Sequence, residues 1–177
     1  LHRPNRRQRQ MCIRDRIGAL ISLEHLEKVE SYIKLGVEEG GTILTGGTRE
    51  MTGRVTAANH GAFLRPTIID GLHHTSRTST EEIFGPVVTV HRFDSDEQAI
   101  EMANSTEYGL AGSIWSTNID RAHGLAQQIE TGIIWVNTWL HRDLRTPFGG
   151  IKNSGVGREG GNWSLGFFSE PLNVCIK

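Results

Sequence analysis

The chain has 177 residues, with 19 Lys and Arg against 20 Asp and Glu, two Cys and 37% hydrophobic residues. No apolar run approaches the roughly 20 residues that a membrane-spanning helix needs. Cys12 and Cys175 give neither a disulfide framework nor a metal-binding spacing. Composition therefore predicts a globular, cytoplasmic protein without a metal site, and excludes membrane, collagenous, disulfide-rich and disordered classes.

The near-neutral total hides two regions of opposite charge. Residues 1–16 hold six Arg and one Asp, a net charge of +5, which leaves −6 for residues 17–177. A basic arm could bind nucleic acid, but this one has no aromatic residue to stack on bases, and a targeting peptide would need an apolar core. The string RRQRQMCIRDR over residues 6–16 resembles a translated sequencing adapter. We predict that residues 1–16 are non-native and disordered, and we expect neither nucleic acid nor membrane as a partner.

The first periodic segment predicts a helix, because apolar residues recur at spacings of three and four from Leu23 to Val37. Ser22 can cap its start, and Gly40 and Gly41 can end it. Further along, we expect strands over Thr42–Leu44 and Val87–Phe93, with extended structure over Gly61–Asp70 that is interrupted at Pro66.

Strands and helices then alternate. We predict helices over Asp94–Asn104 and Asn118–Glu130, and strands over Leu110–Ser116 and Gly132–Val136. This alternation predicts an α/β fold whose parallel-rich sheet is covered on both faces. The stretch Asn137–Gly160 reads as a long loop, and such loops are usually functional. A short helix near Asn162–Phe168 and a terminal strand over Leu172–Ile176 complete the prediction.

One glycine motif matches a cofactor-binding fingerprint but has a purely structural explanation. Gly155 to Gly160 spell GVGREG, which matches the dinucleotide-binding fingerprint GxGxxG. That fingerprint requires a hydrophobic strand directly before it and an acidic residue about 20 positions later. Neither is present, so we interpret these glycines as turn residues.

Two other constellations could bind a ligand. Glu82 and Phe84 precede a predicted strand, where a carboxylate could accept hydrogen bonds from vicinal hydroxyls beside an aromatic ring; the alternative is a solvated Glu82 and a core Phe84. The loop from Thr138 to Gly150 carries Arg and aromatic residues that suit an anionic planar substrate. The alternative there is a surface ion pair of Asp143 with Arg142 or Arg145, with His141 structural or exposed.

Several longer motifs occur together and in order. They are EEIFGPVVTV (81–90), NSTEYGLAGSIWS (104–116), TGIIWVNTW (131–139), PFGGIKNSGVGRE (147–159) and FFSEPLNVCIK (167–177). Residues 17–177 thereby resemble the C-terminal part of the NAD(P)-dependent aldehyde dehydrogenase superfamily. Within it, NTWLHRDLRTPFGG most resembles the 2-hydroxymuconic and 2-aminomuconic semialdehyde dehydrogenases of aromatic-ring and tryptophan breakdown.

The resemblance implies part of a catalytic domain over residues 17–171 and an oligomerisation strand over residues 172–177, in a homodimer or homotetramer. It implies that Glu82 binds the nicotinamide ribose of NAD or NADP, that Phe84 packs beside the nicotinamide, and that Lys28 lies near the adenosine ribose. It further implies that an aldehyde tunnel is lined by Trp139, Arg142 and Phe148. Of these, Arg142 would anchor the distal carboxylate of the substrate.

The family reaction also needs a Cys nucleophile and a Glu general base. The family motifs that carry them are missing from residues 17–177, and neither Cys12 nor Cys175 lies in such a motif. We therefore expect a fragment that is inactive alone, because its nucleophile and coenzyme domain are missing. Two alternatives remain open: a fragment of a broad-specificity or betaine-type aldehyde dehydrogenase, and a non-catalytic binding or structural module of the same fold.

Overall fold

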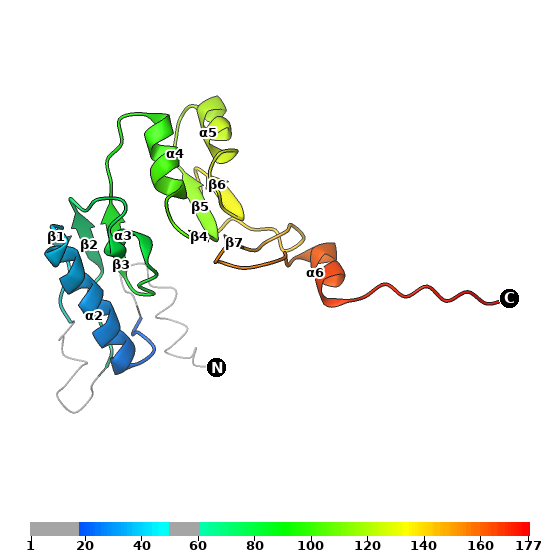
Figure 1. The fold of residues 1–177 in the computed structure, drawn as a ribbon, viewed down its shortest axis with the longest axis horizontal. Helices are drawn as coiled ribbons and strands as arrows, with labels where there is room; N and C mark the ends of the chain where they lie inside the picture. Colours follow the sequence, from blue (N-terminus) through cyan, green and yellow to red (C-terminus); the bar gives the residue numbers. More distant parts are fainter. Residues whose placement is uncertain (1–17, 50–60) are drawn as a thin grey trace, which may run out of the picture. The chain divides into compact units, whose positions relative to one another are not determined.

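A computed structural model describes residues 18–49 and 61–177, so the predictions for residues 1–16 lie outside the described part. The chain divides into two compact units, which meet in the sequence at Arg92 and Phe93. The sequence does not anticipate this division, and the domain bounds that it suggests stay a prediction. The first unit holds α2 (Leu23–Glu38), β1 (Thr42–Thr45), β2 (Thr67–Asp70), α3 (Arg77–Thr80) and β3 (Val87–Val90) (Figure 1). The second holds α4 (Asp96–Asn104), β4 (Tyr108–Gly109), β5 (Ala111–Ile114), α5 (Ile119–Ala126), β6 (Ile133–Val136), β7 (Ile151–Lys152) and α6 (Gly161–Phe168).

Helix α2 forms as the sequence predicts. The Ser22 side chain caps it by accepting a hydrogen bond from the His25 amide at 3.0 Å. After the helix, Gly40 takes a left-handed φ of 94°, and the Gly41 amide donates to the Gly36 carbonyl at 2.8 Å. The apolar stripe of the helix buries Leu26, Val29 and Ile33.

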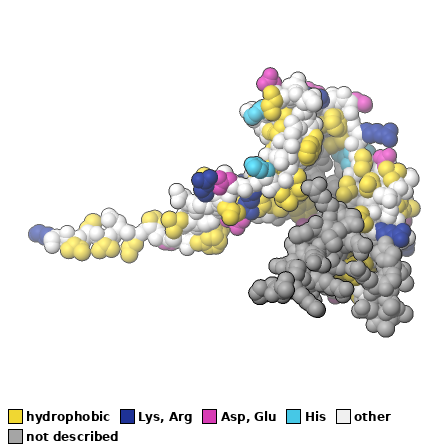
Figure 2. All heavy atoms as spheres, turned by 180° about the vertical axis from the view of Figure 1, so that it is seen from behind, with side chains coloured by type: hydrophobic (Ala, Val, Ile, Leu, Met, Phe, Trp, Pro, Cys, Tyr) yellow, Lys and Arg dark blue, Asp and Glu magenta, His cyan; other side chains and the backbone are white. Residues whose placement is uncertain are grey.

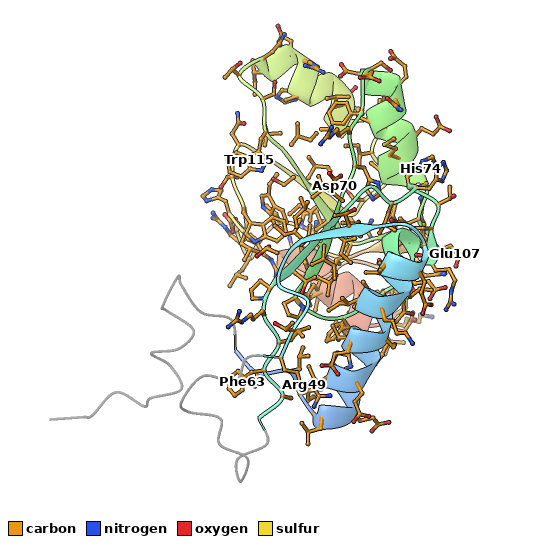
Figure 3. The ribbon with its side chains drawn as sticks, turned by 90° about the vertical axis from the view of Figure 1, so that its left-hand side faces the viewer. Arg49, Phe63, Asp70, His74, Glu107 and Trp115 are labelled. Atoms are coloured by element: carbon orange, nitrogen blue, oxygen red, sulfur yellow. The ribbon has the colours of Figure 1, made fainter. Side chains whose placement is uncertain are left out.

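The sheet of the first unit provides the surface for that stripe. Strand β1 is antiparallel to β2, which is parallel to β3, with Thr67 opposite Val87. Helix α2 lies against this sheet (Figure 1), and its buried residues join Ala62, Leu64 and Ile83 in one core cluster. Arg49, beside α2 in Figure 3, donates two hydrogen bonds of 2.6 Å to Glu30 of the helix.

Two bounds in this unit differ from the prediction. Strand β3 ends at Val90 rather than Phe93, and β2 covers only the part of the predicted extended stretch that follows Pro66, where the predicted interruption falls because proline has no amide to donate. Helix α3, of four residues, was not predicted because a single turn shows no periodicity.

The second unit contains the predicted alternation, which confirms the α/β class. Strands β5 and β6 are parallel, with Ala111 opposite Ile133, and they alternate with helices α4 and α5. Ser95 caps α4 and Asn118 caps α5, each accepting from a backbone amide three residues on. Among the described strands, however, the pairs form three small sheets instead of one, and β1–β2 and β4–β7 are antiparallel.

The long stretch after β6 has more structure than predicted. Strand β7 pairs with β4, and Phe148 and Glu159 form an isolated antiparallel bridge. These pairings are one or two residues long, too short for a recognisable hydrophobic period. The interpretation of Gly155–Gly160 as turn residues is confirmed: Gly157 and Gly160 have φ of 71° and 106°, and a Cβ on Gly157 would lie 2.2 Å from the Phe167 ring.

Residues 169–177 form neither helix nor strand. The strand predicted over Leu172–Ile176 is therefore absent from the single chain, since a strand needs a hydrogen-bonded neighbour and no described residue pairs with it. Leu172, Val174 and Ile176 are 68% to 92% exposed, and Figure 2 shows hydrophobic side chains along this stretch. Across the described ranges, the structure holds no helix long and apolar enough to cross a membrane.

Candidate functional site

Segment 81–85 connects α3 to β3 and carries the first group of candidate residues. Ile83 is 9% exposed and belongs to the core cluster, whereas Glu82 is exposed and Phe84 is 72% exposed. Phe84 takes a left-handed φ of 58°, which is uncommon for a residue with a side chain. The buried Ile83 thus anchors a short segment, and the side chains on either side of it lie outside the core. The alternative in which Phe84 is a core residue is therefore wrong for this chain.

Helix α2 holds the backbone of this segment through two side chains. The His25 ring nitrogen Nε2 lies 2.6 Å from the Phe84 carbonyl oxygen, and the two rings meet edge to face at 5.9 Å. Lys28 Nζ donates to the Glu82 carbonyl at 3.4 Å. The structure thereby brings together Lys28, Glu82 and Phe84, the three residues of the predicted cofactor group. Sequence reasoning missed His25, whose position one turn before Lys28 was the available signal.

The two ends of the segment, Glu81 and Gly85, are held by further contacts. Arg77 donates two hydrogen bonds to the Glu81 carboxylate, at 2.6 and 3.1 Å, and Tyr32 donates a third at 2.7 Å. Hydrogen bonding from Arg77, and then from Tyr32, lowers the pKa of Glu81 below its ordinary value. Gly85 lies so close to α2 that a Cβ there would be 2.7 Å from a methyl group of Val29.

The exposed groups of segment 81–85 fit a nucleotide cofactor. A carboxylate accepts hydrogen bonds from the vicinal hydroxyls of a ribose, and an exposed aromatic ring packs on a planar heterocycle. Glu82 and Phe84 offer these groups on a backbone that α2 fixes in place. Among the described residues, no cluster of three or more His, Cys, Asp or Glu could hold a metal ion.

Loop 137–160 carries the second group of candidate residues. It begins with Asn137, which takes a left-handed φ of 54° and hydrogen-bonds both the amide and the carbonyl of Ser116, at 2.9 and 2.8 Å. The Trp135 indole donates to the His141 carbonyl at 2.7 Å, and its ring meets that of Trp139 at 5.0 Å. Trp139 itself is 59% exposed. Short side-chain contacts to backbone atoms thus hold the first part of this loop.

Arg142 and Phe148 come together in this loop. The Arg142 guanidinium carbon lies 4.1 Å from the centroid of the Phe148 ring, within the range of a cation–π contact. Arg142 Nη2 donates to Glu159 Oε1 at 2.9 Å. Among the described residues, no hydrogen bond, ion pair or ring contact joins Trp139 to this pair, so the structure links two of the three predicted substrate-binding residues through such contacts.

The sequence left open which Arg pairs with Asp143. Arg145 does so, through three side-chain hydrogen bonds of 2.5 to 3.1 Å and one from its amide. The side-chain hydrogen bonding from Arg145, and then the bond from its amide, lower the pKa of Asp143. The Arg142 partner, Glu159, lies 17 residues away, a separation that no local pattern indicates.

A surface pocket of about 440 Å³ lies where parallel strands β5 and β6 end. Its lining comes from both strand ends and from α5: Trp115, Ser116, Thr117, Ile119 and Asn137. Trp115, labelled in Figure 3, is 68% exposed. Sequence reasoning missed this pocket, although the carboxyl ends of parallel strands are a common place for ligands. The two candidate groups lie in different units.

Comparisons of the sequence with known proteins agree with one another. The model of the aldehyde dehydrogenase family matches residues 9–174. The chain is 52% identical over 161 residues to a 2-hydroxymuconic semialdehyde dehydrogenase of Pseudomonas sp. (strain CF600), covering 90% of this chain and 32% of that protein. It is 46% identical to the human 2-aminomuconic semialdehyde dehydrogenase, covering 91% of this chain and 33% of that protein.

Solved structures agree with the sequence relatives. A crystal structure of a betaine aldehyde dehydrogenase point mutant from Staphylococcus aureus, in complex with NAD+, has a TM-score of 0.81 and is 38% identical, covering 86% of this chain and 30% of that one. The present chain thus spans about a third of the length of the relatives it matches. The family match covers most of the sequence, so the chain belongs to the aldehyde dehydrogenase family.

Proposed function

We propose that this chain forms part of the cofactor-binding and substrate-binding surfaces of an NAD(P)-dependent dehydrogenase that oxidises a muconic semialdehyde to the carboxylate. The relative with 52% identity is a 2-hydroxymuconic semialdehyde dehydrogenase, whereas the betaine aldehyde dehydrogenase is 38% identical. This difference in identity favours a carboxylated semialdehyde over a betaine-type substrate. The enzyme would be cytoplasmic and homo-oligomeric, with NAD as its cofactor.

Glu82, Phe84 and Lys28 are the residues that would hold the cofactor. The Glu82 carboxylate would accept hydrogen bonds from the nicotinamide ribose, the Phe84 ring would pack beside the nicotinamide, and Lys28 would face the adenosine ribose. When bound, the cofactor takes up the hydride that leaves the substrate. The contacts of His25 with Phe84 and of Lys28 with Glu82 support this assignment, because they fix the segment before any ligand arrives.

The single observation that carries the substrate proposal is the position of Arg142. Its guanidinium stacks on Phe148 and gives one nitrogen to Glu159, and it is a group that binds carboxylates through two parallel hydrogen bonds. We infer that Arg142 anchors the distal carboxylate of the semialdehyde. Phe148 would support the guanidinium, and Trp139 would form an apolar wall for the unsaturated carbon chain.

We assign no bond-making step to residues 17–177. The family reaction uses a Cys thiolate to attack the aldehyde and a Glu to activate water. Cys175 is exposed in the C-terminal stretch, outside both candidate groups, and Cys12 lies outside the described residues. We therefore expect the purified chain to be inactive alone.

A hybrid enzyme tests the proposal. It places residues 17–177 in the Pseudomonas relative, where they replace the stretch that they match. We expect the hybrid to oxidise 2-hydroxymuconic semialdehyde with NAD+, and Arg142→Ala to lower kcat/KM for it by about 10-fold to 100-fold, since a charge-assisted pair contributes roughly 1.5–3 kcal/mol. The kcat/KM of the Arg142→Ala variant for betaine aldehyde should change by less than about threefold. Equal losses on both substrates would defeat the carboxylate anchor and favour the betaine-type alternative.

The cofactor assignment has its own test in the hybrid. Glu82→Gln should raise KM for NAD+ by about tenfold while KM for the aldehyde stays within about twofold, because one charge-assisted hydrogen bond is weakened. Glu101→Gln, an exposed carboxylate of α4, is the matched control. A change in aldehyde KM alone would contradict the assignment of Glu82.

A non-catalytic module of the same fold remains the alternative from another class. It requires the isolated chain to be a folded monomer. We expect instead that the isolated chain associates, because its exposed side chains include Trp163, Phe168, Leu172 and Ile176. A single cooperative thermal transition of a monomer, by circular dichroism and sedimentation, would favour the module.

A further inference from the structure

The bridge between Phe148 and Glu159 joins two stretches of loop 137–160. The Phe148 amide donates to the Glu159 carbonyl at 2.8 Å, and the Glu159 amide donates to the Phe148 carbonyl at the same distance. Such a pair fixes the backbone of both residues and therefore the points from which their side chains start. Both side chains then contact the same guanidinium, that of Arg142.

The contact with Glu159 uses a small part of what Arg142 can offer. One nitrogen, Nη2, donates to one carboxylate oxygen of Glu159 at 2.9 Å. A guanidinium has five N–H donors, so this bond leaves the other donors available to a second carboxylate. The Arg142 side chain is 28% exposed and that of Glu159 is 59% exposed, so the pair is open to solvent and can be reached by a ligand.

No other acid competes for Arg142 within the described residues. The adjacent acid, Asp143, pairs with Arg145 through both carboxylate oxygens. The direction of the Arg142 guanidinium therefore depends on Phe148 on its face and on Glu159 at one edge. A long arginine side chain that is fixed beforehand loses less rotational freedom when a ligand binds.

We propose that Glu159 is a positioning residue, which sets the direction of Arg142 and through it the preference of the enzyme for carboxylated aldehydes. This inference rests on the proposed function, in which Arg142 binds the distal carboxylate of the substrate. The role is geometric, because the negative charge of Glu159 repels a substrate carboxylate. An uncharged acceptor of the same shape should therefore serve at least as well.

The test compares two substrates in the hybrid enzyme, 2-hydroxymuconic semialdehyde and betaine aldehyde, through the ratio of their kcat/KM values. We expect Glu159→Ala to lower this ratio about fivefold to twentyfold, mainly by raising KM for the carboxylated substrate. Glu159→Gln keeps an oxygen that accepts from Nη2 and should hold the ratio at or above that of the unsubstituted hybrid. Glu101→Ala, on the exposed face of α4, is the matched control and should leave it unchanged.

A double substitution separates positioning from other roles. In an Arg142→Ala background, Glu159→Ala should cause no further fall in the ratio, because the group that it positions is gone. The inhibition constant of an unsaturated six-carbon dicarboxylate, measured on the same variants, gives a second readout that does not depend on turnover. Melting temperatures within about 2 °C of the hybrid show that each variant is folded.

Three results would overturn the inference, and a fourth would overturn the proposed function on which it rests. Equal losses on both substrates with Glu159→Ala would mean that Glu159 acts on the reaction itself, and failure of Glu159→Gln to restore the ratio would remove the geometric role. If Arg142→Ala leaves the ratio unchanged, the proposed function fails first. If Arg142→Ala changes the ratio and Glu159→Ala does not, the positioning role alone fails.

Discussion

Segment 81–85 and loop 137–160 are held in place by different means. The segment has a core residue at its centre, Ile83, and packs against a capped helix. In the loop, the fixed contacts are side-chain hydrogen bonds, ion pairs, the Phe148–Glu159 bridge and the short pairing of β7 with β4, and all of its side chains are at least partly exposed. The comparison teaches that the proposed cofactor residues have both a buried anchor and polar contacts from α2, whereas the proposed substrate residues lie on a loop that has no buried side chain of its own.

The largest effect on stability should follow from a substitution that creates a cavity under segment 81–85. In the hybrid enzyme, Ile83→Ala removes a buried side chain, which typically costs about 2–4 kcal/mol in cores. Amide hydrogen exchange, read by mass spectrometry, should rise in the peptide around residues 81–90 and stay unchanged in loop 137–160. Val88→Ala, at a position that is 59% exposed, is the control. Faster exchange in the loop as well would break the comparison.

A steric substitution should have the next largest effect. A Cβ at Gly85 would lie 2.7 and 2.8 Å from the two methyl groups of Val29, so Gly85→Ala should destabilise the segment by about 1–3 kcal/mol. Adding Val29→Ala removes the clash and should recover part of the melting temperature. At Gly124, in α5, a Cβ meets no atom within 4 Å, so Gly124→Ala should be neutral or slightly stabilising. If the double variant loses as much melting temperature as the two single variants together, the residues at positions 85 and 29 do not clash.

The loop should respond to loss of a polar contact instead. Asn137→Ala removes both hydrogen bonds to Ser116 and places alanine at a left-handed φ, which together should cost about 1–3 kcal/mol. Asn137→Gly loses the same bonds but accepts that φ, so it should be milder by about 1 kcal/mol. Hydrogen exchange should rise in the loop and KM for the aldehyde should rise with it, while KM for NAD+ stays constant. Equal effects of the two variants would mean that backbone strain contributes nothing here.

The smallest effect concerns pH. The pKa of Glu81 is lowered by its hydrogen bonds from Arg77 and Tyr32, so its contribution to stability is present above its ordinary pKa and is lost as the pH falls through the lowered value. Glu81→Gln should therefore weaken the fall in melting temperature between about pH 5 and pH 3, by a small amount because the pair is exposed to solvent. Glu97→Gln, in the first turn of α4, is the control. Identical pH profiles for Glu81→Gln and the unsubstituted hybrid would show that this carboxylate carries no acid dependence.

The sequence predicts those elements that are long enough to show a hydrophobic period and that have clear caps. Helix α2, with Ser22 and the apolar stripe to Ile33, is confirmed nearly to the residue. The order of elements from α4 to β6 is confirmed too, but α5 ends at Ala126 rather than Glu130 and β5 covers only Ala111–Ile114. The two-residue strands β4 and β7 and the four-residue α3 were missed, because elements that short carry no periodic signal. A single parallel-rich sheet was expected, but the described strands pair in three sheets, since strand pairing depends on long-range contacts.

The candidate site divides in the same way. Side chains near each other in sequence, such as Glu82 and Phe84, could be grouped from spacing, and Arg142 with Phe148 from their shared loop. Partners that the fold brings from elsewhere could not: His25 reaches Phe84 from 59 residues away, and Glu159 reaches Arg142 from 17 residues away. The sequence suggested the adjacent Asp143 as a partner of Arg142. The structure shows that the partner is Glu159, which lies in the same charged loop.

The bridge between Phe148 and Glu159 also bears on how substrate preference can change during evolution. Its two ends carry the aromatic face and the carboxylate that hold Arg142. Exchange of residues 142–159 between related enzymes would transfer the cation, its platform and its partner as one inherited block.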